Sequence, residues 1–138
     1  MKPALIALLA LATPACAETH EVKMFNRNDK GSMIYEPQYL EIAPGDTVKF
    51  LAAQPSHNAA TIDGMIPEGA EPFKGGINEE IEVTLTVPGT YGIKCSPHFA
   101  MGMVMLIRVG GGPGAELPED LPARARQRFE EILAQMQK

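Results

Sequence analysis

Short runs with apolar residues at every second position are the feature that most constrains the fold of this chain. Such alternation is typical of β-strands that bury one face. It is strictest at residues 81–87 and 103–109, and it recurs in shorter form at residues 22–24, 40–42 and 48–50. The 13 glycines and 12 prolines among 138 residues supply many turns between the runs. We therefore expect an all-β domain, an antiparallel sandwich of two sheets with seven or eight strands.

The N-terminus has the pattern of a secretory signal. Lys2 precedes a short apolar run at residues 4–12, and Ala15-Cys16-Ala17 has the small residues typical of a cleavage site. The apolar run is too short to span a bilayer. We expect residues 1–17 to be a cleaved signal peptide, so that the exported chain begins at Glu18 in a bacterial periplasm. A lipoprotein anchored at Cys16 is the alternative, but Thr13 stands where such signals usually have leucine.

The remaining chain divides into two parts. Residues 18–109 contain the alternating runs and form the expected sandwich. Residues 110–138 begin with a glycine-rich hinge and continue into one expected helix, which has Pro122 near its first turn. Apolar residues recur in this helix at spacings of three and four. They form a stripe that we expect to pack on the sandwich: Leu121, Ala125, Phe129, Ile132 and Met136.

Cys95 is the cysteine that remains once the signal is removed, so it has no partner for an internal disulfide. An unpaired thiol in an oxidising compartment is either buried and inert or bound to a metal. Residues 95–103 read Cys-Ser-Pro-His-Phe-Ala-Met-Gly-Met, which places a thiolate, the imidazole of His98 and two thioethers on one loop. A second imidazole, that of His57, follows the expected strand at residues 48–53. These neighbours favour a metal site.

Two imidazoles and a thiolate in a trigonal plane, with a long bond to a thioether, are the ligands of blue copper electron-transfer sites. Zinc is the nearest rival, but structural zinc usually has four strong ligands and this pattern has no second cysteine or carboxylate. A cysteine hydrolase would need a group that orients His98. A copper oxidase or nitrite reductase would need more than the three histidines of this chain. A methionine-rich copper carrier is a further alternative, but it leaves His57 unexplained.

The segment from Cys95 to Met103 resembles the ligand loop of the small blue copper proteins, the cupredoxins, and within that family most closely the pseudoazurin group. Other segments resemble the same family: residues 35–37, 43–48, 57–58, 64–71 and 77–79. The resemblance extends over the whole exported chain. It implies a cupredoxin-like Greek-key β-sandwich with a C-terminal α-helical extension.

The same resemblance implies one type 1 copper ion per chain, with His57, Cys95, His98 and Met103 as its ligands. Met101 is also available, and strand parity does not decide between the two methionines. The spacing from His98 to Met103 resembles that of pseudoazurins and plastocyanins, whereas Met101 would match the shorter amicyanin loop. The resemblance further implies that the backbone N–H of Asn58 donates to the Cys95 sulfur.

The function that the resemblance implies is electron transfer without catalysis. Implied partners are a copper nitrite reductase or c-type cytochromes, which would dock transiently near His98, and we expect a monomer. A periplasmic copper carrier is the alternative function. A net charge of −5 without a basic block argues against nucleic acid as a partner. Candidates for an apolar docking patch are Pro97, Phe99, Ala100 and Met101, with Ile66 and Pro67.

His20 adds one hypothesis about a second site. In an exported chain that begins at Glu18, His20 is the third residue. The free amine, two amides and the imidazole could then form a square-planar chelate for Cu(II). A solvated histidine near the chain end is the simpler interpretation, so a weak second copper site is a hypothesis only.

Overall fold

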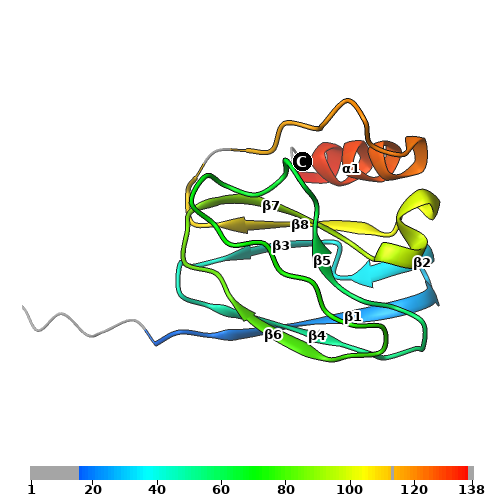
Figure 1. Ribbon diagram of the computed structural model, residues 1–138, viewed down its shortest axis with the longest axis horizontal. Helices are drawn as coiled ribbons and strands as arrows, with labels where there is room; N and C mark the ends of the chain where they lie inside the picture. Colours follow the sequence, from blue (N-terminus) through cyan, green and yellow to red (C-terminus); the bar gives the residue numbers. More distant parts are fainter. Residues whose placement is uncertain (1–15, 113, 137–138) are drawn as a thin grey trace, which may run out of the picture.

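Residues 16–112 and 114–136 are described in the computed structural model of the chain (Figure 1). Residues 1–15 of the expected signal peptide lie outside them. The described part contains a 3₁₀ helix, η1 (Ser96–Met101), and an α-helix, α1 (Ala123–Met136). Its strands are β1 (Thr19–Asn28), β2 (Gly31–Glu36), β3 (Tyr39–Ile42), β4 (Thr47–Leu51), β5 (Ala60–Thr61), β6 (Ile81–Thr84), β7 (Gly89–Lys94) and β8 (Val104–Val109).

The strands form two four-stranded sheets, in the orders β2-β1-β4-β6 and β3-β8-β7-β5. This is the β-sandwich that the alternation predicts. The expectation of antiparallel pairing throughout is wrong for two pairs, because β1 and β4 are parallel and so are β3 and β8. The chain crosses from the first sheet to the second between β2 and β3, and it returns with β4 beside β1 in the same direction.

The core lies between the two sheets. Alternate residues of β1 and β4 enter it, for example Val22, Met24, Val48 and Phe50, which are fully buried. β8 differs because both of its faces are covered. Met105, Ile107 and Val109 face the interior of the sandwich, whereas Val104 and Leu106 belong to a second apolar cluster under the helix.

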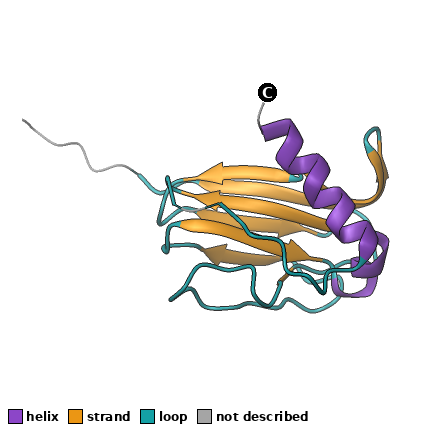
Figure 2. Cartoon of the chain, turned by 90° about the horizontal axis from the view of Figure 1, so that it is seen from above, coloured by secondary structure: helices purple, strands orange, loops and turns teal. Residues whose placement is uncertain are grey.

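Helix α1 lies across the outer face of the second sheet (Figure 2). Ala125, Phe129 and Ile132 of the expected stripe are buried against β8, and Leu121 and Met136 are partly buried at the same cluster. The guanidinium of Arg128 also donates to the carbonyl oxygen of Met33 in β2, at 2.7 Å. α1 contacts η1 as well as β8, so it reaches the loop that carries Cys95 and His98. Among residues 16–112 and 114–136, no helix combines the length and apolar character needed to cross a membrane.

Candidate metal centre

The loop between β7 and β8 carries two of the expected ligands. Cys95 follows the last residue of β7, and η1 holds His98 before the chain returns into β8 at Val104. Backbone hydrogen bonds close this loop: the N–H of Cys95 donates to the carbonyl of Met103 at 3.0 Å, and the N–H of Met103 donates to the carbonyl of His98 at 3.1 Å. Cys95, His98 and Met103 are therefore fixed relative to one another by the backbone.

His57 comes from a different loop, after β4, and is held from two directions. Its carbonyl accepts the N–H of Asn78 at 2.8 Å. Its ring Nε2 lies 2.6 Å from Oδ1 of Asn26, near the end of β1. Because the amide oxygen of Asn26 can only accept, the Nε2 of His57 donates its proton in this bond. The other ring nitrogen, Nδ1, is thereby left as the acceptor that faces Cys95.

Three donor atoms meet at this end of the sandwich. The Nδ1 atoms of His57 and His98 are 3.1 Å apart, and the Sγ of Cys95 lies 3.7 Å from the first and 3.4 Å from the second. The centre of a triangle with these sides is about 2 Å from each atom, close to the usual metal–nitrogen and metal–sulfur bond lengths of about 2.0 and 2.3 Å. The residues present therefore fit a single ion bound by two imidazoles and a thiolate.

The structure separates the two methionines that the sequence leaves open. Met103 has no exposed surface and packs in the sandwich core with Cys95, whereas the side chain of Met101 is 43% exposed at the end of η1. They point differently because residues 96–101 form a helical turn and not an extended strand. Met103 is thus the thioether on the interior side of the loop.

The electrostatic environment favours the neutral forms of both Cys95 and His57 before a metal binds. Burial raises the pKa of the Cys95 thiol, while hydrogen bonds from the backbone N–H groups of Asn58 and His98 oppose that increase. The bond from Asn58 agrees with the expectation from the sequence. Burial also lowers the pKa of His57, and the neighbouring His98 lowers it further. A neutral imidazole is the form that binds a metal, and binding would displace the thiol proton.

Asn58 joins the two ligand loops. Its Oδ1 accepts the backbone N–H of Ser96 at 2.6 Å, and its Nδ2 donates to the hydroxyl of Ser96 at 3.1 Å. The buried hydroxyl of Tyr35 donates to the carbonyl of Asn58 at 2.6 Å. These bonds connect the segment after His57 with the segment after Cys95. The ligand positions therefore depend on protein contacts that need no metal.

His98 is partly exposed, unlike the other candidate ligands, and apolar side chains lie close to it in the chain. Pro97, Ala100 and Met101 are exposed, and Phe99 is partly buried under the ammonium group of Lys94, 5.1 Å from its ring. The expectation that Pro67 belongs to the docking patch is wrong. Pro67 lies against Gly89 at the start of β7, and Cys95 follows the other end of that strand.

Two residues at this end were not identified from the sequence. Asn26 orients His57, but an asparagine within a strand carries no sequence signal for such a role. Ile77 is 51% exposed and precedes Asn78, which binds the backbone of His57. An exposed isoleucine in a turn-rich segment is a common surface feature, and only its proximity to the ligand loop makes it notable.

A sandwich of two four-stranded sheets, with a Cys-His-His centre at one end, defines a small copper-binding β-protein. The family of copper-binding proteins of the plastocyanin/azurin type matches residues 22–110, and the chain belongs to this family. The chain is 47% identical to pseudoazurin of Paracoccus pantotrophus over 133 residues, which cover 94% of this chain and 92% of that protein. Its relatives thus include the pseudoazurins, the group expected from the sequence.

Solved structures also relate the chain to the pseudoazurins. The crystal structure of pseudoazurin from Methylobacterium extorquens AM1 matches with a TM-score of 0.80 and 36% identity, over 86% of this chain and 98% of that one. A copper-containing nitrite reductase of Thermus scotoductus matches with a TM-score of 0.50 and 28% identity, over 76% of this chain but 25% of that one. The chain is a copper-binding, blue copper electron-transfer protein and not an enzyme.

Proposed function

We propose that His57, Cys95, His98 and Met103 hold one type 1 copper ion, and that the protein carries single electrons between redox proteins in a bacterial periplasm. The observation that supports this most directly is the convergence of two Nδ1 atoms and one Sγ atom about a common centre. When bound, the copper supplies a one-electron couple between Cu(II) and Cu(I). The periplasmic location rests on the secretory pattern of residues 1–17.

The residues around the centre keep the ligands in one arrangement. Asn26 fixes the ring of His57, and Asn58 ties the two ligand loops together. The buried thioether of Met103 lies on the interior side, within the apolar core. A site whose ligands are fixed by the protein changes little in geometry when its charge changes, and small reorganisation favours fast electron transfer. Burial of Cys95 and His57 also excludes water from the thiolate.

Electrons enter and leave through His98, because it is the candidate ligand whose side chain reaches the surface. The two most exposed large apolar side chains in the described part of the chain, Ile77 and Met101, belong to this end of the molecule. Such a small apolar surface suits a transient complex and not a stable dimer, so we propose a monomer. The charge of Lys94 at the margin of Phe99 is placed to steer an acidic partner.

Two classes of partner fit this surface, a copper nitrite reductase and a c-type cytochrome. The similarity to one quarter of a copper-containing nitrite reductase means that a domain of this fold occurs within the same polypeptide as that enzyme. The choice of these two partners rests on the family resemblance and on the surface around His98. A copper carrier that gives up the metal itself is the alternative function, and it requires a site that loosens when the copper is reduced.

Adding Cu(II) to the purified exported chain, residues 18–138, distinguishes these functions. An electron-transfer protein turns intensely blue, bleaches on reduction, recovers on oxidation and retains its copper through repeated cycles. A colourless product, or copper lost at each reduction, would refute the proposal. The ligand assignment is tested with Met103→Leu, which should change the visible spectrum. Met101→Leu is the matched control and should leave the spectrum unchanged.

A further inference from the structure

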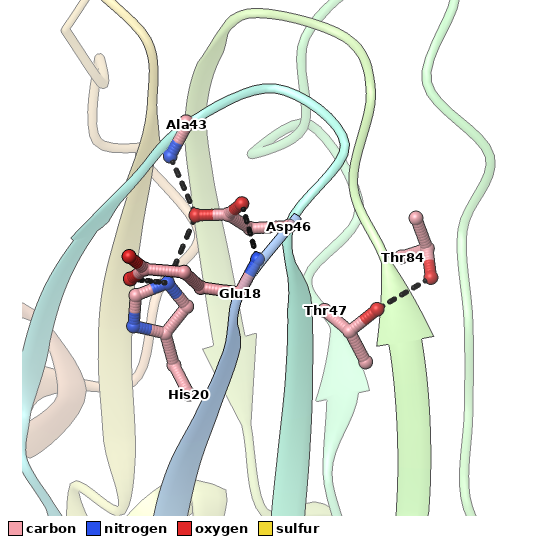
Figure 3. Close-up of polar contacts among 6 residues, drawn as sticks. All are labelled: Glu18, His20, Ala43, Asp46, Thr47 and Thr84. Atoms are coloured by element: carbon pink, nitrogen blue, oxygen red, sulfur yellow. Dashed lines mark hydrogen bonds and ion pairs between the residues drawn. The ribbon is translucent and has the colours of Figure 1, made fainter. Parts of the chain in front are cut away.

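Glu18, His20 and Asp46 form a second group of side chains that could hold a metal ion (Figure 3). His20 lies at the start of β1, whereas Glu18 directly precedes β1 and Asp46 directly precedes β4. Because His20 and Asn26 are six residues apart on β1, at about 3.3 Å per residue, the two ends are separated by about 20 Å. This group therefore does not belong to the centre that contains His57 and Cys95.

The backbone fixes the carboxylate of Asp46 in this group. Its side chain is only 8% exposed. Oδ1 accepts the backbone N–H of Glu18 at 3.0 Å, and Oδ2 accepts the backbone N–H of Ala43 at 3.0 Å (Figure 3). The bond from Glu18, followed by those from His20 and Ala43, holds the pKa of Asp46 below its ordinary value of 3.8. A buried carboxylate is thus kept charged and in place without any contribution from a metal.

The other two donors face this carboxylate. The Nε2 of His20 lies 2.9 Å from Oδ2 of Asp46 and 3.9 Å from Oε2 of Glu18. Ligand atoms that bind one ion at about 2.0–2.2 Å are about 3–3.5 Å apart. His20 and Asp46 are already close enough to share an ion, so only the Glu18 carboxylate must move toward His20. Its side chain is 75% exposed and free to do so. One imidazole and two carboxylates are donors that suit Zn²⁺ or Cu²⁺.

The surroundings leave room for an ion and its water. The three side chains line a hollow that is open to solvent and is also bounded by Ala43, Gly110 and Gly111. Glu41 and Arg108 line the same hollow and contribute opposite charges. The local charge remains negative because Glu18 and Asp46 are both carboxylates. An incoming cation therefore finds two anionic oxygens and one imidazole within reach.

We propose that Glu18, His20 and Asp46 form a second metal site, remote from the copper centre, that binds Zn²⁺ or Cu²⁺ with water completing the coordination. The donor set differs from the amino-terminal chelate suggested by the sequence. That chelate needs the amide nitrogens of Thr19 and His20 to converge, but both residues belong to β1 and pair in register with β4. Successive amide groups of a strand point to opposite edges. A metal at the proposed site would join the start of β1 to the turn before β4.

Zinc titration of the copper-loaded protein tests this site. The chain is produced with Ala17 ahead of Glu18, so that the nitrogen of Glu18 is a peptide nitrogen and the amino-terminal chelate cannot form. Calorimetry should then detect one Zn²⁺ bound per chain in addition to the copper. The blue absorption is recorded throughout, and its persistence shows that zinc does not displace the copper.

Two substitutions and one control identify the ligands. His20→Gln and Glu18→Gln should each weaken zinc binding about tenfold or more. Glu21→Gln removes a carboxylate from the next exposed position of β1 and should leave zinc affinity unchanged. The proposal would be overturned if the unchanged chain bound no zinc at this site, or if the His20→Gln chain bound zinc as tightly as the unchanged chain. The three side chains would then form a hydrogen-bonded cluster without a metal. An unchanged blue spectrum in every variant separates this result from any failure of the copper centre.

Discussion

Gly102 is the point at which the ligand loop touches helix α1, and its replacement by alanine tests whether the helix holds that loop. The residue ends η1 with a φ of +89°, and its N–H donates to the carbonyl of Phe99 at 3.0 Å. A Cβ atom at this position would lie 2.9 Å from the carbonyl oxygen of Arg124 and 3.2 Å from its carbonyl carbon. These are backbone atoms of α1 and cannot rotate away as a side chain would.

The expected cost of Gly102→Ala has two parts. A left-handed backbone costs a non-glycine residue about 1 kcal/mol or more. Forcing a methyl group against the packed backbone of α1 adds about 1–3 kcal/mol, so we expect a total loss of about 2–4 kcal/mol in the free energy of unfolding. Gly69 is the matched control, because its φ is +86° and no atom lies within 4 Å of a Cβ built there. Gly69→Ala should cost only the backbone part, about 1 kcal/mol.

Urea unfolding of the metal-free chains measures both losses, since bound metal would add its own stabilisation. The visible spectrum of the copper-loaded Gly102→Ala chain then reports whether the ligand loop has moved. A loss for Gly102→Ala no larger than that for Gly69→Ala would refute the reasoning. It would mean that α1 shifts at no cost and does not constrain the loop that carries Cys95 and His98.

Two further predictions concern the hydrogen bonds at the two ends of β1. Asn26→Ser removes the acceptor for Nε2 of His57, and we expect copper affinity to fall about 10–100-fold in competition with a chelator; unchanged affinity would contradict an orienting role. The pKa of Asp46 is lower in the folded chain than its ordinary value of 3.8 in the unfolded chain. The charged carboxylate therefore stabilises the fold fully at a pH well above 3.8, and this stabilisation is lost as the pH falls through the folded pKa. Between about pH 5 and pH 3, urea unfolding should therefore show a smaller loss of stability for Asp46→Asn than for the unchanged chain, whereas equal losses would contradict this.

The strands that the sequence predicts well are those with one face in the core. Residues 22–24 and 48–50 alternate because Val22, Met24, Val48 and Phe50 enter the space between the sheets. β5 cannot be predicted from alternation, because it contains only two residues and both are buried. The parallel pairing of β1 with β4 could not be predicted either. Alternation determines which face of a strand is buried, but it says nothing about which strand lies beside it or in which direction.

The candidate site was predictable where its residues are close in the chain. Cys95, His98 and Met103 lie on one loop, so their donor chemistry is visible in nine consecutive residues. His57 lies far from this loop in the chain, and its inclusion depends on the second imidazole that a blue copper site needs, with the family resemblance as further support. Asn26 cannot be predicted from the sequence, because its contact with His57 exists only once β1 lies beside β4. Contacts of this kind depend on strand order, which the alternation of residues does not encode.

β1 links these observations, because one strand supplies groups to both ends of the molecule. Near its end, Asn26 orients His57 at the copper centre, and at its start His20 faces Asp46. The strand is paired on both sides and its interior residues Val22 and Met24 are fully buried. A strand held in this way cannot shift at one end without disturbing the core. The geometry at the copper centre is therefore set by the packing of the sandwich as a whole, which is what a carrier that changes charge without changing shape requires.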